Sequence, residues 1–419
     1  MASLEESSNS MVYQPPTGAR DLLPLEVAQK QWIEDRLEQV FRRWGYHPII
    51  TSTVEHLDTL MAGGAIDQKA VIELNHASGE RLGLRPELTA SIARIAVSRL
   101  AQVTYPQRLY YHANVFRQKG TGHQELYQSG VELLGAAAPL ADMEILLLLN
   151  DCLANLNLPP WSLVLGHAQL TRMLLEPFPK SLRTPVRRAL AQLDRVALGE
   201  LDLPPHLYDR ALFLLDLRGE PETILATLAQ PDLDLVPLAA LRPVQQLVDL
   251  LRQDIFSVNS ETAVQPQLIL DLSLIQTFDY YTGLVFEVVS SPELGCQVLG
   301  QGGRYDNLLG LFHSEGKSFP GIGFVLNSEV LHKCLGRKGG LPQRAPASDW
   351  LVVPTDPQAV AAAFSYAQKL RQSASLVRAE VHLGEFSSRP ALRTVAEKRG
   401  ITRIAWIDAY GLPDIEIRN

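Results

Sequence analysis

Two strand-like runs joined by a short polar loop constrain this fold more than any other feature of the sequence. Arg108–Arg117 and Glu125–Leu134 are rich in aliphatic and aromatic residues, and Gln118–Gln124 connects them. A connection this short cannot make the crossover that parallel strands need, so the two runs must pair antiparallel. The sequence therefore predicts an antiparallel sheet at the centre of the fold.

Helices and shorter strands are expected on both sides of this pair. Apolar residues recur at helical spacing over 25–44, and Gly45 stands where helices commonly end in the left-handed conformation. Two short runs of strand formers, 70–74 and 82–85, flank a turn-rich stretch and predict a hairpin. Further helices are expected over about 87–102 and 143–156, and further strands over 162–165, 268–272, 283–289 and 297–300. These elements predict an α+β fold in which helices flank a sheet.

Changes in composition along the chain predict its domains. Residues 1–12 are polar and predict a flexible tail, and residues 13–335 contain the sheet. Within that core, strand formers are sparse over about 176–261, where Leu, Ala, Pro and Arg dominate, so we expect an inserted helical subdomain. A linker rich in Gly, Pro and basic residues follows at 336–349, and 350–419 alternates strand-like and helical patterns. That alternation predicts a small α/β domain, with a parallel sheet.

Charge and cysteine content argue against several kinds of site. The formal net charge of −8 lowers the expectation of a nucleic-acid partner, because proteins that bind phosphate backbones usually carry a basic face. The cysteines are far apart and form no CxxC pair, so neither a disulfide framework nor a metal site is expected: Cys152, Cys296 and Cys334. The start of the chain lacks the apolar segment of a signal peptide, and the apolar run 145–149 is too short to span a bilayer. We expect a cytoplasmic protein with no cofactor and no membrane partner.

Four motifs, in order along residues 15–335, resemble the catalytic core of histidyl-tRNA synthetases. Leu84–Ala90 resembles that family's Leu-Arg-Pro-Glu-Gly-Thr-Ala, and Gln128–Glu132 resembles its Gln-x-Gly-x-Glu. Gln276–Tyr281 resembles its Arg-Gly-Leu-Asp-Tyr-Tyr, and Gly302–Asp306 resembles its Gly-Gly-Arg-Tyr-Asp. The resemblance implies the class II synthetase fold, an antiparallel sheet flanked by helices.

The resemblance also implies a set of histidine-binding residues. In the family, the ammonium is held by the positions that match Glu87, Thr89 and Gln128, and the imidazole by those that match Glu132 and Tyr281. All five residue types are present. They are either a retained amino-acid site or a polar network inherited with the sheet, and the sequence leaves both open.

The positions that handle phosphate in the resembled family have changed. Gln276 and Val330 stand where the family has arginines, and Lys119 stands where it has a glutamate that contacts the nucleotide. A guanidinium is a permanent charge with a rigid bidentate fork, which neither an amide nor an alkyl group replaces. Among these phosphate-handling positions, only Arg117 keeps the residue type of the family. We therefore expect these former catalytic positions to be inactive.

A synthetase-like core without its catalytic arginines resembles the regulatory subunits of ATP phosphoribosyltransferase. That resemblance implies a non-catalytic protein with a catalytic transferase subunit as partner, which supports the activity of that subunit and histidine feedback in histidine biosynthesis. It further implies free histidine as effector, no tRNA partner, and a self-dimer, for which Gly45–Glu55 offers an apolar stretch. The alternatives are an active histidine–tRNA ligase and a free-standing histidine-sensing module.

Overall fold

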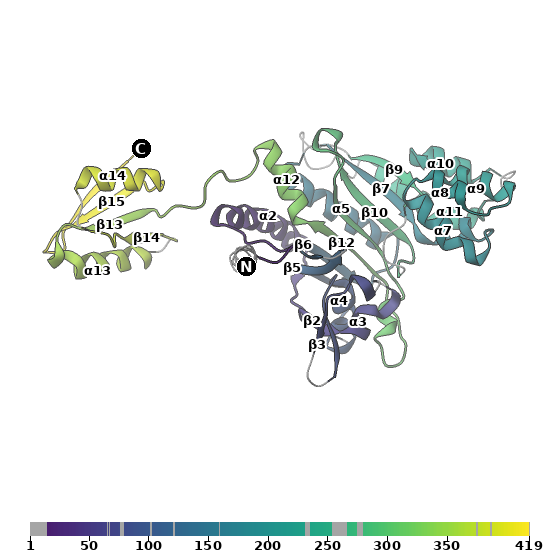
Figure 1. Ribbon diagram of the computed structural model, residues 1–419, viewed down its shortest axis with the longest axis horizontal. Coiled ribbons are helices and arrows are strands. Elements are labelled where there is room, and N and C mark those ends of the chain that lie inside the picture. Colours follow the sequence, from purple (N-terminus) through teal and green to yellow (C-terminus); the bar gives the residue numbers. More distant parts are fainter. Residues whose placement is uncertain are drawn as a thin grey trace, which may run out of the picture. The chain divides into compact units, whose positions relative to one another are not determined.

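The chain folds into two compact units, each with its own sheet, in the computed structural model (Figure 1). The structure describes residues 15–64, 66, 68–75, 79–100, 103–119, 122–158, 160–230, 235–253, 266–274, 280–373, 376–385 and 388–418. The larger unit comprises residues 1–21 and 29–341, and the smaller comprises 22–28 and 342–419. The predicted tail at 1–12 and the former catalytic position Gln276 lie outside the described residues.

A nine-stranded sheet forms the centre of the larger unit. Its long central hairpin confirms the predicted antiparallel pair, which is in register from Gln107 opposite Leu134 to Lys119 opposite Gly122. In spatial order the strands are β1 (His47–Pro48), β5 (Gln107–Lys119), β6 (Gly122–Leu134), β12 (Gly321–Asn327), β11 (Val298–Arg304), β10 (Leu284–Ser290), β7 (Trp161–His167), β9 (Gln267–Asp271) and β8 (Arg218–Gly219).

Most neighbouring strands of the sheet pair antiparallel, as the class II synthetase-like fold predicts, and two pairs are parallel. Strand β1 pairs with β5 in parallel, and β7 pairs with β9 in parallel. Parallel neighbours require a long crossover connection. The helical segment between β7 and β9 provides that connection, as the stretch between β1 and β5 does for the other pair.

The two faces of the sheet bury separate hydrophobic cores. Along β6, Val131 and Leu133 point into one core, while Leu126 and Leu134 point into the other, as the two-residue period of a strand requires. Helices α2 (Pro24–Arg43), α5 (Leu140–Asn155) and α12 (Ser328–Lys338) contribute to the first core, and α3 (Leu57–Met61) and α4 (Thr89–Ser98) to the second. Burial of each large apolar side chain stabilises the folded state by about 1.5–3 kcal/mol relative to leaving it exposed to water.

Helix α2 confirms the helix expected over 25–44. Ile33, Leu37 and Phe41 lie on its buried stripe, and all three are fully buried. Gly45 has a φ of +78° just beyond the end of the helix, a conformation that favours glycine.

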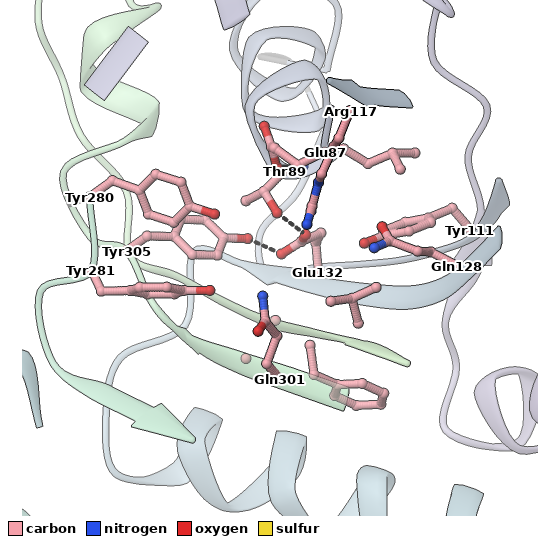
Figure 2. Close-up of a pocket in the computed structure, with 15 residues that line it drawn as sticks. Glu87, Thr89, Tyr111, Arg117, Gln128, Glu132, Tyr280, Tyr281, Gln301 and Tyr305 are labelled. Atoms are coloured by element: carbon pink, nitrogen blue, oxygen red, sulfur yellow. Dashed lines mark hydrogen bonds between the residues drawn. The ribbon is translucent and has the colours of Figure 1, made fainter. Parts of the chain in front are cut away.

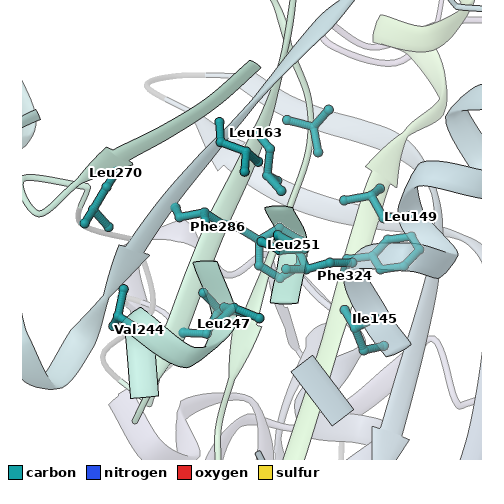
Figure 3. Packing of buried hydrophobic residues seen from close by; sticks show 14 of the residues in the cluster. Ile145, Leu149, Leu163, Val244, Leu247, Leu251, Leu270, Phe286 and Phe324 are labelled. Carbon is teal, nitrogen blue, oxygen red and sulfur yellow. The ribbon is translucent and has the colours of Figure 1, made fainter. Parts of the chain in front are cut away.

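The predicted helical insertion is present over the described part of 176–261. It packs against the sheet through α11, whose Val244, Leu247 and Leu251 meet Leu163 and Phe286 in the first core (Figure 3). The two-residue strand β8 in this segment was not predicted. The helices from β7 to β9 are α6 (Ala168–Leu175), α7 (Lys180–Ala191), α8 (Arg195–Glu200), α9 (Pro205–Leu215), α10 (Pro221–Leu228) and α11 (Leu238–Arg252).

A second, three-stranded sheet lies among the elements of the other core. Its order is β2 (Val54–His56), β4 (Arg81–Leu84), β3 (Glu73–Asn75), and all its pairs are antiparallel. The β3–β4 pair confirms the predicted hairpin, although its first strand begins at Glu73 because 68–70 forms a 3₁₀ turn. The α4 helix begins at Thr89, two residues later than expected.

Two motif arginines are structural. Arg85 is buried and donates through Nη1 to the carbonyl of Thr51 at 3.0 Å and through Nε to that of Asn114 at 3.0 Å. Arg304 is also buried, and its Nη2 lies 2.6 Å from Oδ1 of Asp142 at the start of α5. Buried charges of this kind are stable only when paired and hydrogen-bonded, so both residues hold the sheet to its neighbours.

The smaller unit is a four-stranded sheet with two helices. Strand β13 (Trp350–Pro354) pairs in parallel with β14 (Ala379–Val381) and β15 (Arg403–Ile407), which confirms the predicted parallel sheet. An additional edge strand, β16 (Pro413–Ile417), pairs antiparallel with β15 and was missed. The helices are α13 (Val360–Arg371) and α14 (Arg389–Lys398).

The predicted boundaries of the core and linker stay a prediction. Helix α12 runs to Lys338 and so takes in the first residues of the expected linker at 336–349.

None of the helices in the described ranges is both long enough and apolar enough to cross a membrane.

Candidate functional site

A polar pocket opens on the α4 side of the central sheet, with a volume of about 400 Å³, part of it open to solvent. The five predicted histidine-binding residues all line it, although they come from β6, from α4 and the residues just before it, and from the segment before β10 (Figure 2). The polar and aromatic residues that line the pocket are Glu87, Thr89, Tyr111, Arg117, Gln128, Glu132, Tyr280, Tyr281, Gln301 and Tyr305.

Glycines of the central strands leave room for this pocket. Gly323 lies opposite Glu132 in the sheet, and a Cβ atom there would collide with the Glu132 carboxylate. A Cβ atom at Gly303 would lie 2.7 Å from the ring of Tyr281. Side chains at these two positions would therefore displace the acidic and aromatic groups that define the site.

Glu132 is the most buried charged group of the pocket. Its Oε1 accepts a hydrogen bond of 2.8 Å from the Thr89 hydroxyl, and its Oε2 accepts one from the Tyr305 hydroxyl. Its side chain is almost wholly buried, and that burial raises the pKa of Glu132 to about 8, against the opposing effect of these two hydrogen bonds. Burial thus favours the protonated form of this carboxyl group near neutral pH.

Glu87 holds the N-terminus of helix α4. Its carboxylate accepts from the backbone N–H of Thr89 at 2.5 Å and of Ala90 at 2.8 Å, two donors that have no partner within the helix. Burial raises the pKa of Glu87, whereas these N–H groups and the charge of Arg117 lower it. A carboxylate offers about four acceptor positions, so two remain for a ligand ammonium.

Arg117 is the only residue with a permanent positive charge among the described residues that line the pocket. Its Nε donates to the carbonyl of Pro86 at 2.9 Å, which fixes the guanidinium beside the α4 N-terminus. Burial lowers the pKa of Arg117, and the charge of Glu87 opposes that effect.

Two pocket amides have no hydrogen-bond partner among the described residues. Gln128 is only 7% exposed and lines the pocket, and its side chain bonds no residue that the structure describes. Gln301 is partly buried and likewise lines the pocket. An amide carries two donors and an acceptor, so both side chains are available to a polar ligand or water in the pocket.

Of the other two former catalytic positions, Val330 lies away from this lining. Val330 is in the first turn of α12, where it packs against the core on the opposite face of the sheet. Lys119 is the last residue of β5, and its backbone pairs with Gly122.

Sequence reasoning gave no binding role to Tyr305 or Gln301. Both belong to or adjoin the Gly302–Asp306 motif, and the strand alternation of positions 301, 303 and 305 places them on the pocket side. That alternation, counted from the pocket residue Glu132 across the paired strands, is the pattern that could have identified them.

Known proteins match this chain over most of its length. Residues 18–331 match the family described as histidyl-tRNA synthetase. An ATP phosphoribosyltransferase regulatory subunit from Nostoc sp. is 54% identical over 410 residues, which cover 97% of this chain and 99% of the relative. A regulatory subunit of the same name from Cyanothece sp. is 55% identical over 413 residues, with the same shares.

Solved structures agree with these matches. A Bacillus halodurans protein described as an ATP phosphoribosyltransferase regulatory subunit/histidyl-tRNA synthetase has a TM-score of 0.73 at 27% identity, over 94% of this chain and 97% of that one. The histidyl-tRNA synthetase of Nostoc sp. has a TM-score of 0.74 over 97% of each chain, but at 19% identity it supports only the predicted class II synthetase-like fold. The chain therefore belongs to the histidyl-tRNA synthetase family, among its ATP phosphoribosyltransferase regulatory subunits.

Proposed function

We propose that this protein is a non-catalytic subunit that supports the activity of a short ATP phosphoribosyltransferase catalytic subunit and conveys feedback by histidine. The observation that carries the proposal is one polar pocket that gathers all five predicted histidine-binding residues, in a chain whose relatives, at 54–55% identity, are regulatory subunits of that enzyme. A cytoplasmic location, free histidine as effector and the absence of a tRNA partner complete it.

The groups of the pocket suit histidine. Glu87, Thr89 and Gln128 supply acceptors for an ammonium, and Arg117 supplies the positive charge that a carboxylate needs. Glu132 suits an imidazole nitrogen, because one proton can be shared between the two groups whichever of them carries it. The charges of Glu87 and Arg117 offset each other, so a zwitterion enters a site that is close to neutral.

Histidine can regulate a partner only through unequal binding. A ligand shifts an equilibrium between two states of an assembly by the difference between its affinities for them, and the coupling is reciprocal. We therefore infer that the pocket has different affinities for histidine in the active and inhibited complexes.

Glu132→Ala is expected to weaken histidine binding by about ten- to a hundredfold. The substitution removes the partner of the imidazole and leaves the hydroxyls of Thr89 and Tyr305 without their acceptor. Loss of the hydrogen bond between Glu132 and the imidazole is expected to cost about 1.5–3 kcal/mol of binding free energy. Calorimetry on the purified protein measures the affinity, and the histidine concentration that half-inhibits the reconstituted complex should rise by the same factor.

Glu293→Ala, at the exposed turn between β10 and β11, is the matched control and should bind as the wild type does. An unchanged affinity in Glu132→Ala would place the regulatory site elsewhere, at the contact with the catalytic subunit. Failure of the complex to gain activity from the wild-type chain would contradict the proposed function itself.

We also propose a self-dimer through the stretch Gly45–Glu55. Ile50 is 93% exposed just after the edge strand β1, while Arg85 holds the loop from below through the carbonyls of Thr51 and Ser52. An exposed apolar side chain on a fixed loop suits a two-fold interface, the commonest kind in oligomers.

Light scattering at micromolar concentration should therefore show a dimer, and Ile50→Asp should shift it toward monomer by at least about tenfold in dissociation constant. Val196→Asp, at another exposed apolar residue, should leave the dimer intact. A monomeric wild type would disprove this interface.

A further inference from the structure

Gln301 occupies a position in the sheet from which its side chain reaches the bound ligand. In the paired strands it lies opposite Val325 of β12 and Glu287 of β10. The neighbouring row of the same face runs from Glu132 through Gly323 to Gly303. Strands are about 4.8 Å apart, so Glu132 and Gln301, two strands apart, stand on opposite sides of the open space above the glycines.

The Gln301 amide is directed into that space. In Figure 2 its amide end extends from β11 toward the side of the pocket where Glu132 and Tyr281 lie. No hydrogen-bond partner for this side chain exists among the described residues, whereas Glu132 is held by Thr89 and Tyr305. The Gln301 side chain therefore contributes no hydrogen bond to the described scaffold.

A purely structural role does not account for a glutamine at this place. On the same face of the sheet, Gly303 and Gly323 leave the pocket open, and a long side chain beside them reduces the space for a ligand. A carboxamide carries both donors and an acceptor. Those groups complement a ring that offers one donor and one acceptor, which is the hydrogen-bonding pattern of a neutral imidazole.

We propose that Gln301 is a specificity-determining residue that hydrogen-bonds the side-chain ring of the bound amino acid, together with Glu132 and Tyr281. The proposal rests on the proposed function, since it takes histidine as the ligand. It assigns the ring end of the ligand to the β11 side of the pocket. Arg117 and the α4 N-terminus then face the amino-acid backbone groups.

The test is calorimetry on the full chain with two ligands, L-histidine and L-histidinol, which keeps the ring and ammonium but lacks the carboxylate. Gln301→Ala should weaken the binding of both ligands by about the same factor, roughly tenfold. Gln301→Glu has the same length but loses the donors and adds a third carboxylate to the pocket, so it should also bind more weakly. Gln297→Ala, at an exposed glutamine of the same hairpin, should bind both ligands as the wild type does.

Three results would overturn the proposal. If Gln301→Ala binds histidine as tightly as wild type, the side chain does not contact the ligand. If the loss is present with histidine and absent with histidinol, the amide contacts the carboxylate instead of the ring. A large fall in melting temperature with unchanged affinity would assign Gln301 to the scaffold. A wild type that binds neither ligand contradicts the proposed function, and this outcome is distinct from all three.

Discussion

Purified wild-type protein is expected to catalyse no measurable histidine-dependent exchange of pyrophosphate into ATP. The resembled synthetases have Arg, Glu and Arg where this chain has Gln276, Lys119 and Val330. Removal of one electrostatic contact to a transition state commonly costs about 100- to 1,000-fold in rate, so three such losses together should cost about a millionfold or more. Val330 has an uncharged side chain and packs against the core on the other face of the sheet, so it supplies no charge to a triphosphate.

The control is an active histidyl-tRNA synthetase assayed in the same buffer at the same enzyme concentration. Addition of the catalytic transferase subunit to this chain should not produce exchange either, because the lost charges belong to positions of this chain. Robust exchange by the wild-type chain would disprove the non-catalytic assignment and favour an active ligase.

The wild-type protein is expected to become less stable as the pH rises from 4.5 to 8, and Glu132→Gln is expected to abolish that pH dependence. The pKa of Glu132 is raised from an ordinary value of 4.5 to about 8, so between these values the native state binds a proton that the unfolded chain has released. The free energy of unfolding of the wild type therefore falls across this range and is unaffected by Glu132 below it. Between pH 4.5 and pH 8, Glu132 lowers the free energy of unfolding of the wild type by about 4 kcal/mol.

The glutamine is expected to fit because the hydroxyls of Thr89 and Tyr305 can donate or accept a hydrogen bond. Urea unfolding from pH 4.5 to 8 measures the effect: the two proteins should be similar at pH 4.5, and the variant should be the more stable at pH 8. Glu293→Gln, an exposed control, should follow the wild type. Parallel curves for Glu132→Gln and wild type would show that the carboxyl group titrates normally.

The local pattern of the sequence predicted most of the larger unit because short connections and strand alternation act over a few residues. The hairpin of β5 and β6 and the helix over Pro24–Arg43 follow from such patterns. The parallel pairs β1–β5 and β7–β9 were not predictable in this way, because they depend on the packing of segments far apart in the chain. Strand β16 was missed because Pro413, Asp414 and Glu416 give it the composition of a turn.

The candidate site was predicted through motifs, which named five residues that the structure brings into one pocket. The motifs could not show that Glu87 is already bound by its own helix or that Glu132 is bound by Tyr305. Gln301 escaped notice because the pairing of its strand, rather than any motif, places it in the pocket. Resemblance thus identifies residue types, whereas strand pairing decides which of them face a ligand.

The hydrogen bonds from Thr89 and Tyr305 to Glu132 join three segments that are remote in the sequence. The pocket is therefore complete only after helix α4 and the central strands have assembled. A ligand that binds only the assembled state stabilises the whole larger unit against unfolding, by an amount that grows with the logarithm of its concentration. Under the proposed function, histidine would therefore stabilise the folded subunit as well as regulate the complex, and its melting temperature should rise with the histidine concentration.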